Sequence, residues 1–544
     1  MANKQNMALK LYKILILVSC SIILCDSARI LCLFPTSSFS HQSVFRALTH
    51  ELARRGHDVV VITPNPAFPK GQTPDNLTEI DIHDELSFTI ETWNKAMRQH
   101  GLQDYLAAED KYVKTMQIVY KQMTETFEAL ANNEEVQKIF KDNKKKIDLL
   151  ILEAWPRPLL VLSHIFKVPV IQISSFGTMV RNYETVGAIG NPLLLPTGLR
   201  LRVHNMTIWE KFVELYNYIT LTNFYDSYEE TDNAMLRKLF GPDVPPLSEL
   251  ANNVDMLFLN VNPIWNGNWP APPSVVHLGG LHLELYEPKP LPKDLQTYLD
   301  NSHNGAIYVS FGTNIAPSAM SLDRLSTFID AFAKLPYNVL FKYDQESLPM
   351  KQPENVMISK WFPQADVLNH TNIKLFICQG GLQSTDEALM NGVPLIGIPM
   401  LGDQWFNTEK YEHHRIGKKL DFNTVTEEEL LNSIETVIKD ETYRQNVLKL
   451  YELMNDQPQS SLERAVWWTE HVLRHGGARH LRAPAANMSW WQYLEMELVL
   501  LALAIVLIAL TISGISIYFF LKFMFSLFIV YLSKFFNENK VKTN

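Results

Sequence analysis

Short apolar runs alternate with helical stretches in this chain, and this alternation limits its fold more than any other feature of the sequence. The apolar run Ile30–Pro35 is followed by the polar segment Thr36–Ser40 and then by a helical pattern that ends at Gly56. The apolar face of that helix comprises Val44, Phe45, Leu48 and Leu52. A second apolar run, Val59–Thr63, follows at once. Strand, loop, helix, strand is the order of a parallel βαβ unit, whose functional groups lie at the carboxyl ends of its strands.

Two series of such runs are separated by a stretch rich in proline. The first series continues with Leu149–Leu152 and Val168–Ile173. The second series comprises Ala306–Phe311, Val339–Tyr343, Leu375–Cys378 and Pro394–Ile398. Breaker-rich segments at Pro270–Pro273 and Pro288–Pro292 lie between the two series. We therefore expect an α/β protein with two Rossmann-like domains, residues 29–283 and 301–475, that are joined by a linker at 284–300 and face each other across a cleft. Helical or irregular segments between Leu77 and Phe140 and between Thr178 and Leu250 are expected to line one side of this cleft.

Both ends of the chain carry features of a membrane-anchored protein. Lys4, Lys10 and Lys13 precede the uncharged run Ile14–Cys25, and small residues follow it, which predicts a secretory signal peptide at residues 1–28. Near the other end, the uncharged run Leu498–Leu521 is long enough to cross a bilayer as a helix.

Charges around this second run predict its orientation. The acidic residues Glu495 and Glu497 precede it in a juxtamembrane segment at 476–497. The lysines of the tail at 522–544 are Lys522, Lys534, Lys540 and Lys542. The positive-inside rule then predicts a cytosolic tail, a lumenal body and a single-pass type I topology.

Two further features fit a body in the lumen of the endoplasmic reticulum. Lys540 and Lys542 stand five and three places from the carboxyl terminus, which resembles the dilysine signals that retain membrane proteins there. The candidates for N-glycosylation are Asn76, Asn205, Asn369 and Asn487, each in an Asn-x-Ser/Thr sequon.

Composition excludes several classes of function. With 544 residues, 47% of them hydrophobic, the chain exceeds the size of one core and predicts two domains. A net charge of −9 argues against nucleic acid as a partner. Only Cys32 and Cys378 lie in the body, each within an apolar run that predicts a buried strand, so a disulfide framework and a cysteine zinc site are excluded.

The most informative stretch runs from Trp361 to Gln404. A predicted strand ends at Gln379, the glycines Gly380 and Gly381 permit close backbone approach, and a helix is expected to start at Ser384. Free amides at a helix start bind anions without a metal. Ser384 and Glu387 also fit a capping box, which would explain both residues without a ligand.

Other residues of the same stretch suit a nucleotide sugar. The Trp361 indole can stack on a flat base, and the Gln364 amide can pair with the edge of uracil. Asp403 and Gln404 offer the acceptor and donor that sugar hydroxyls require.

This stretch resembles the signature of the UDP-glycosyltransferase family, which contains the UDP-glucuronosyltransferases, and the resemblance covers nearly the whole chain. It implies a GT-B fold and a hexosyltransferase that uses a UDP-sugar as co-substrate, with neither a metal nor another cofactor. It also implies a place for each donor-site residue: Ser310, Gly312 and Thr313 at the diphosphate, Trp361 and Gln364 at uracil, Gln379, Gly381, Gln383 and Ser384 at the phosphates, Glu387 at the ribose, and Asp403 and Gln404 at the hexose.

One residue departs from the vertebrate pattern. Vertebrate glucuronosyltransferases usually have a histidine before the two glycines, whereas this chain has Gln379. An amide donates a hydrogen bond to phosphate but carries no positive charge. Glutamine here is similar to insect-type members, many of which prefer UDP-glucose, so the donor is UDP-glucose or UDP-glucuronate.

The resemblance also assigns a catalytic pair. His41 follows the first strand and starts the first helix, a position where a lone histidine is often only a surface or capping residue. The family's catalytic histidine falls at this loop, which makes His41 the expected base, and Glu153 stands where the family has the aspartate that orients it. Transfer is then expected to invert the anomeric carbon of the hexose.

The acceptor is less defined than the donor. A small lipophilic hydroxyl compound such as a phenol, steroid, plant toxin or pigment fits a role in detoxification or conjugation. A membrane-tethered protein that binds UDP-sugars or lipophilic ligands without turnover is the alternative, and a structural or adhesion ectodomain is excluded because alternating strands and paired cysteines are absent from the sequence. The predicted span is also compatible with a homo-oligomer.

Overall fold

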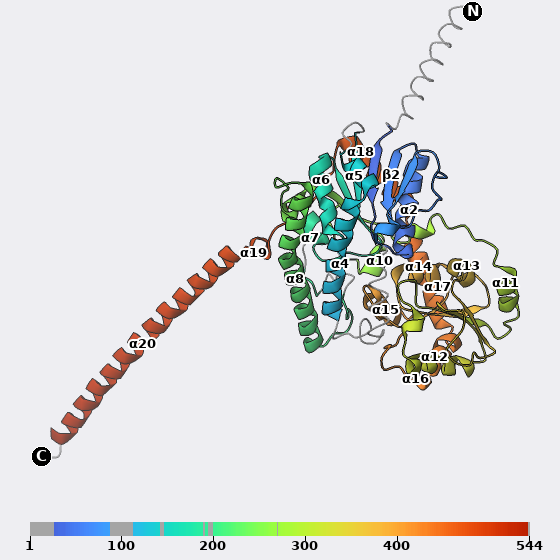
Figure 1. The fold of residues 1–544 in the computed structure, drawn as a ribbon. Helices are drawn as coiled ribbons and strands as arrows, with labels where there is room; N and C mark the ends of the chain where they lie inside the picture. Colours follow the sequence, from blue (N-terminus) through green and yellow to red (C-terminus); the bar gives the residue numbers. More distant parts are fainter. Residues whose placement is uncertain are drawn as a thin grey trace, which may run out of the picture. The chain divides into compact units, whose positions relative to one another are not determined.

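The body of the protein is built on two parallel β-sheets (Figure 1). The computed structural model describes residues 27–86, 112–141, 146–188, 191–193, 200–268 and 270–541. Both sheets belong to one compact unit that ends at Ala486, and Asn487–Asn544 form a second unit. The expected signal peptide lies outside the described residues except at its last two positions.

The first sheet has the strand order β3-β2-β1-β4-β5-β6-β7. All of its neighbouring strands are parallel. Its strands are β1 (Arg29–Leu33), β2 (Asp58–Thr63), β3 (Leu77–Asp81), β4 (Leu149–Glu153), β5 (Val170–Ser174), β6 (Val254–Leu259) and β7 (Val275–His277). The chain moves outward from β1 through β2 to β3 and then returns to the other side of β1 with β4. This reversal is a topological switch point, where parallel sheets open a crevice for ligands.

The second sheet has a similar topology, with the strand order β10-β9-β8-β11-β12-β13, and all of its neighbouring strands are parallel. Its strands are β8 (Ala306–Ser310), β9 (Asn338–Lys342), β10 (Val356–Ser359), β11 (Ile373–Cys378), β12 (Leu395–Gly397) and β13 (Gly417–Lys419). The switch point here lies between β8 and β11. The expected α/β fold with two Rossmann-like halves is therefore confirmed.

Helices cover both faces of the sheets. Those of the first half are α2 (Phe39–Arg54), α4 (Tyr112–Asn132), α5 (Glu134–Lys141), α6 (Val161–Phe166), α7 (Asn182–Val186), α8 (Ile208–Phe240), α9 (Leu247–Leu250) and α10 (Pro263–Asn266). Those of the second half are α11 (Lys293–Asp300), α12 (Leu322–Ala333), α13 (Gln364–Leu368), α14 (Leu382–Met390), α15 (Gln404–His413), α16 (Glu427–Lys439) and α17 (Thr442–Asn455). Short 3-10 helices are η2 (Arg157–Leu160), η3 (Ala251–Asn253), η4 (Leu281–Leu283), η5 (Pro317–Ala319) and η6 (Arg479–Leu481).

The continuous apolar runs of the strands reflect this double cover. Ile30 and Cys32 of β1 join a core cluster with α2, whereas Leu31 and Leu33 join a different cluster with α4. Successive side chains of a strand point to opposite faces, so a strand with helices on both sides needs apolar residues at every position. Cys32 and Cys378 are fully buried in strands, as predicted.

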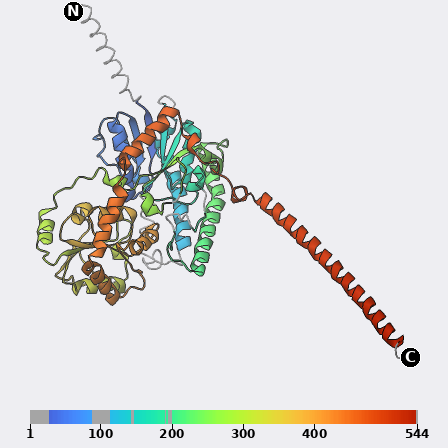
Figure 2. The same cartoon turned by 180° about the vertical axis from the view of Figure 1, so that it is seen from behind.

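The last helix of the body crosses back onto the first half. α18 (Ser461–His475) places Ala465, Val466 and Val472 in the same core cluster as α2. Seen from behind, the orange helices α17 and α18 run from the second half onto the first (Figure 2). The second domain was expected to extend to residue 475 and so to include α18. The apolar face of this helix is buried against the first sheet instead.

Several elements differ from the sequence expectations. Five strands, β3, β6, β7, β10 and β13, were not among the predicted runs. The predicted linker at 284–300 ends in α11, which buries Leu295 and Leu299 in the core. Proline at position 292 is the residue just before this helix, so a breaker there marks a helix start as well as a linker.

The second unit holds a short helix, α19 (Trp490–Tyr493), and a long one, α20 (Met496–Val541). Met496–Phe535 of α20 is apolar enough to cross a membrane, with a mean hydropathy of 2.9 over an 18-residue window. The helix continues past the expected end of the span at Leu521, because the apolar run Phe523–Tyr531 follows the single charge of Lys522. Lys542 lies outside the described residues.

Candidate active site

His41 is held at the first turn of α2 by a well-connected loop. Ser38 is the N-cap residue of α2, and its carbonyl accepts hydrogen bonds from the backbone N–H groups of His41 and Gln42. The buried Gln42 side chain donates to the carbonyls of Phe34 (2.9 Å) and Thr36 (2.8 Å). These bonds fix the path of the chain from β1 into the helix, so the position of the imidazole is set by the loop.

Glu153 stands beside His41 at the end of the neighbouring strand β4. Its Oε1 lies 3.7 Å from Nδ1 of His41, and neither of these two buried atoms has another hydrogen-bond partner. Its Oε2 accepts a hydrogen bond from the Thr36 N–H at 3.1 Å. A fully buried carboxylate that is anchored on one oxygen and faces an imidazole nitrogen with the other can orient the ring and stabilise its protonated form.

His41 opens into a cavity that both halves line. Its volume is about 320 Å³. The first half contributes mainly apolar side chains: Pro35, Leu86, Met116, Val119, Met123, Trp155, Pro156 and Phe176, with polar Thr36, Ser37, Ser38, Gln122 and Thr126. The second half contributes Thr313, Asn314, Leu401, Gly402, Asp403 and Gln404. The predicted base and the predicted hexose-binding pair therefore share one cavity, at the carboxyl ends of both sheets.

Asp403 is oriented by a chain of hydrogen bonds that starts in the other half. The indole Nε1 of Trp265, a fully buried residue of α10, donates to Oδ1 of Asn407 at 2.9 Å. Nδ2 of Asn407 donates to Oδ2 of Asp403 (2.8 Å) and to the Gly380 carbonyl (2.9 Å). Burial raises the pKa of the Asp403 carboxyl to about 6, while the bond from Asn407 and the nearby His41 oppose that rise. The neighbouring Gln404 uses its Oε1 to accept the N–H groups of Met400 and Leu401.

The glycine loop after β11 packs closely on its surroundings. Gly380 has φ +87°, and a Cβ there would lie 2.4 Å from the Thr408 side chain, so α15 leaves no room for another residue. Gly312, after β8, has φ +77°, and a Cβ there would lie 2.3 Å from Nε2 of Gln379. The Oε1 of Gln379 is buried and has no hydrogen-bond partner. The switch point of the second sheet thus brings Ser310, Gly312 and Gln379 together.

The predicted capping box is wrong. α14 begins at Leu382 with Gly381 as its N-cap residue, so Ser384 and Glu387 lie inside the helix. Instead, Nε2 of Gln364 donates to both Oγ of Ser384 (2.9 Å) and Oε2 of Glu387 (2.8 Å), and Tyr308 donates to Oε1 of Gln364 at 3.2 Å. Burial raises the pKa of Glu387 to about 7, opposed by the bond from Gln364. Both residues are thus bonded to the Gln364 side chain on α13, and neither caps the start of α14.

Trp361 is half-exposed beside these residues, at 54%. Its ring meets the edge of Phe39 from the first half, with centroids 5.6 Å apart and planes at 85°. Nζ of Lys342 lies 4.8 Å from the indole centroid and donates to the Gly312 carbonyl at 2.8 Å. Burial lowers the pKa of Lys342 to about 8, opposed by Asp344. An exposed indole face next to a cation and a glycine turn suits a flat base followed by phosphates.

The whole chain from β1 into α20 matches one family. Residues 29–528 match the sequence profile described as "UDP-glucoronosyl and UDP-glucosyl transferase". The chain belongs to this family. An ecdysteroid UDP-glucosyltransferase of Lymantria dispar multicapsid nuclear polyhedrosis virus is 38% identical over 477 residues, 87% of this chain and 92% of that protein. UDP-glucosyltransferase 2 of Dactylopius coccus is 32% identical over 503 residues, 90% of this chain and 92% of that protein. The resemblance found in the sequence is confirmed, and the chain is a UDP-hexosyltransferase.

Solved structures of two glycosyltransferases share the fold of this family member. Glycosyltransferase VinC in complex with DTDP has a TM-score of 0.55 at 16% identity, over 82% of this chain and all of that one. The glycotransferase of kitacinnamycin has a TM-score of 0.52 at 17% identity, over 81% of this chain and 98% of that one. These similarities confirm the expected GT-B arrangement.

The residues that the family resemblance assigns are brought together with one exception. Ser310, Gly312, Thr313, Gln379, Asp403 and Gln404 lie around the switch point of the second sheet or the shared cavity. Gln364, Ser384 and Glu387 are joined by hydrogen bonds, and Trp361 contacts Lys342 near the Gly312 turn. Nε2 of Gln383, however, donates to the Ser175 carbonyl of the first half at 2.7 Å. In this transferase Gln383 joins the two halves, and one of its two amide N–H donors is engaged in that bond.

Sequence reasoning missed several residues that shape the site. Gln42, Asn407 and Lys342 carry structural hydrogen bonds, and Trp155 and Phe176 border His41 at ring centroid distances of 5.8 and 5.7 Å. A signal existed for Asn407, because it stands four residues after Asp403 on the same face of a helix. The position of Lys342 at the carboxyl end of a predicted strand was a second signal.

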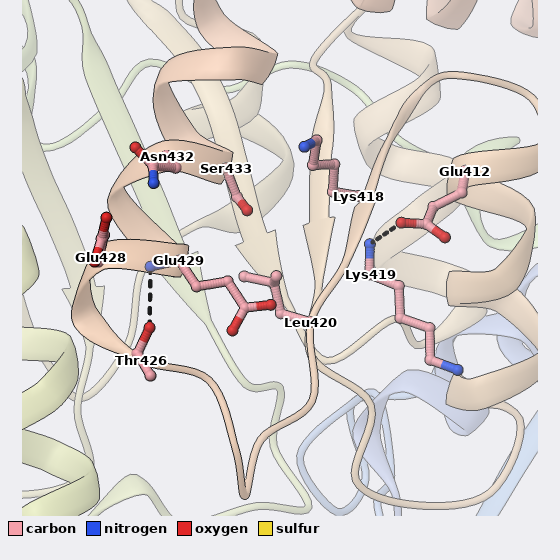
Figure 3. Close-up of a pocket in the computed structure, with 9 residues that line it drawn as sticks. All are labelled: Glu412, Lys418, Lys419, Leu420, Thr426, Glu428, Glu429, Asn432 and Ser433. Carbon is pink, nitrogen blue, oxygen red and sulfur yellow. Dashed lines mark hydrogen bonds between the residues drawn. The ribbon is translucent and has the colours of Figure 1, made fainter.

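Other polar features lie away from this site. A hollow of about 440 Å³ is bordered by α15, β13 and α16, and no sequence-predicted site residue lines it (Figure 3). Among the described residues, no group of three or more His, Cys, Asp and Glu side chains is placed to hold a metal. All four sequon asparagines are exposed.

We expect Asn407→Ala to lower kcat/KM for the UDP-sugar by about 10- to 100-fold, since it removes a hydrogen bond to a buried carboxylate. Because that bond holds down the pKa of Asp403, the acidic limb of the pH–rate profile should also move to higher pH. Asn455→Ala, which removes only an exposed bond to the Tyr451 carbonyl, is the control. An unchanged pH limb in Asn407→Ala would contradict this role.

We expect Glu387→Gln to reduce the pH dependence of stability. The folded pKa of Glu387 is raised to about 7 from an ordinary 4.5, so the native state binds more protons than the unfolded state between these values, and stability falls as pH rises through this window. Glutamine keeps the acceptor for Gln364 but has no charge to bury, so the variant should gain on the order of 1–3 kcal/mol relative to wild type at pH 8 and little at pH 4.5. Thermal melts of both proteins at the two pH values measure this, and equal slopes would refute it.

Proposed function

We propose that this transferase moves glucose from UDP-glucose to a hydroxyl group of a small lipophilic acceptor, with His41 as the general base and inversion at the anomeric carbon. The observation that carries the proposal is that His41 and Asp403, from opposite halves, line one cavity. Direct displacement requires a base beside the acceptor hydroxyl and a residue that binds the hexose of the donor.

In this mechanism His41 takes the proton of the acceptor hydroxyl, and the oxygen attacks the anomeric carbon as the bond to the diphosphate oxygen breaks. Glu153 keeps the imidazole oriented and stabilises its protonated form through the 3.7 Å approach to Nδ1. UDP leaves toward the start of α14 and the Gly312 turn, where backbone N–H groups and Lys342 offset its charge. Each step uses only side chains and backbone groups of the described site.

The charges of the cavity favour glucose as the transferred sugar. Among the described residues that line it there is no lysine or arginine, and the titratable side chains are His41 and Asp403. A uronate carboxylate would therefore meet Asp403 without a fixed cation to balance it. Curated relatives that carry the name UDP-glucosyltransferase, together with the neutral Gln379, support the same donor.

The cavity lining also indicates the acceptor class. Met116, Met123, Trp155 and Phe176 present apolar and aromatic surface next to His41. Methionine adapts to different shapes, so a neutral phenol or steroid fits this side better than a charged or highly polar compound. Because several viral relatives are named for ecdysteroids, an ecdysteroid belongs in the acceptor panel beside simple phenols. Conjugation of such compounds is the proposed biological role.

The proposed location is the lumen of the endoplasmic reticulum, with α20 as a single-pass anchor. Support comes from the apolar length of Met496–Phe535, the acidic residues before it and the lysines after it. The exposure of Asn76, Asn205 and Asn369 on the body fits N-glycosylation there.

We expect His41→Ala to lower kcat by about 100- to 10,000-fold with UDP binding retained. Glu153→Gln should lower kcat less, since the amide still occupies the place beside Nδ1 but carries no charge. UDP release and conjugate mass measure turnover, and calorimetry measures UDP binding. His303→Ala, at an exposed loop histidine, is the control. UDP binding by the wild type without transfer to any acceptor would instead favour the tethered binding protein.

We expect kcat/KM for UDP-glucose to exceed that for UDP-glucuronate by at least about 10-fold, since like charges at close range cost several kcal/mol. Parallel assays with both donors and one phenolic acceptor measure the ratio. In Asp403→Asn the ratio should fall, because the repelling charge is gone. Equal use of both donors by the wild type would show that the charge of the cavity does not select the sugar.

A further inference from the structure

The first three turns of α8 expose a row of large apolar side chains. Ile208 is 88% exposed, Trp209 70%, Phe212 61% and Tyr216 63%. Val213 and Ile219 extend the row at 37% and 46%. The rings of Trp209 and Phe212 stack with centroids 5.8 Å apart and planes at 13°. We call these six residues the α8 apolar face.

The α8 apolar face occupies one side of the helix, and the body holds the other. At 100° per residue the six side chains cover roughly 140° of the helix circumference. On the opposite side Glu214 is buried, and its carboxylate accepts the Arg202 N–H at 2.9 Å and lies 3.6 Å from the Arg200 guanidinium. Farther along, Leu221 and Tyr225 enter the core. The helix thus packs on the body through its opposite side, and the α8 apolar face remains exposed.

Exposed apolar residues elsewhere in the described body are scattered. Phe39, Leu285, Leu322, Trp361, Leu448, Leu453 and Trp467 belong to six different segments. Single exposed apolar residues are normal on a soluble surface, whereas a contiguous aromatic row marks a site of interaction. The α8 apolar face groups six exposed apolar side chains on one helix, which indicates a binding surface.

Features of this chain identify the partner as lipid. Its second unit carries the apolar helix Met496–Phe535, which would keep the body next to a bilayer. Tryptophan, tyrosine and phenylalanine are the residues that favour the boundary between headgroups and acyl chains. The exposed Lys211 flanks the row and suits anionic or zwitterionic headgroups.

We propose that the α8 apolar face inserts into the interfacial layer of the membrane that α20 crosses, giving the body a second attachment. The proposal rests on the membrane anchor proposed above and is independent of the catalytic roles. It also bears on acceptor access. α8 packs on α4 through Tyr225 and Tyr120 at 5.2 Å, and Met116 and Met123 of α4 line the cavity. A lipophilic acceptor dissolved in the bilayer would then meet α8, the helix that packs against α4 of the cavity wall.

The test uses full-length protein in phosphatidylcholine–phosphatidylserine vesicles. Phe212→Cys on α8 and Leu453→Cys on α17 each receive an environment-sensitive NBD label. The two positions are similarly exposed, at 61% for Phe212 and 53% for Leu453. The body cysteines, Cys32 and Cys378, are fully buried and should stay unlabelled. Emission wavelength and quenching by lipids brominated near the headgroup report contact with the interface.

We expect NBD at position 212 to emit at shorter wavelength and to be quenched at least about two-fold more than NBD at position 453. Adding Trp209→Asp and Tyr216→Asp to Phe212→Cys should abolish the difference while turnover of a soluble phenol stays unchanged, which separates this surface from the active site. Equal quenching at both positions would overturn the proposal. A shift at position 212 without bromine quenching, lost on dilution of the protein in lipid, would assign the surface to a second copy of the chain. Failure of all variants to float with vesicles would refute the anchor and the proposal together.

Discussion

The hydrogen bond from the Trp265 indole to Asn407 is the interaction on which the site depends. Trp265 belongs to the first half and Asn407 to the second. The Asn407 amide in turn donates to the Asp403 carboxylate, so the contact between the halves orients Asp403. The same amide donates to the Gly380 carbonyl, so the glycine loop and Asp403 share one support. A buried indole N–H without this partner would cost free energy, so the contact also favours one spacing of the two halves.

Buried carboxylates give the site its electrostatic character. Burial raises the pKa values of Asp403 and Glu387 to about 6 and about 7, and each carboxylate accepts a hydrogen bond from an amide side chain, Asn407 and Gln364 respectively. Amides accept and donate without adding charge, which is compatible with the proposed contacts to sugar hydroxyls. On the side proposed to hold the diphosphate, Gln379 is neutral, and the cation beside the Gly312 turn is Lys342, whose Nζ donates to the Gly312 carbonyl.

Much of the fold was readable from residue patterns, whereas the partners of individual side chains were not. Strands such as β1 and β11 are short runs that are apolar and buried except at Arg29 and Lys374 near their starts, which is what burial between two helix layers demands. Strand β3, with exposed Thr78 and Asp81, and strand β13, with glycine and two lysines, lie at sheet edges and lack that signal. Ser384 and Glu387 matched a capping box by spacing, but Gln364 from another helix was the better partner.

The sequence by itself determined the α/β class, the pairing of two Rossmann-like halves, the family, and the apolar helix near the carboxyl end, because these depend on local periodicity and on motifs that are contiguous in the chain. Only the tertiary structure decided that α18 returns to the first sheet, that Gln383 bridges to Ser175, that Trp265 reaches Asn407, and that α8 leaves an aromatic row uncovered. Such outcomes depend on which surfaces meet after folding. The free energy of burial and hydrogen bonding is shared between residues more than 100 positions apart, and no local pattern records it.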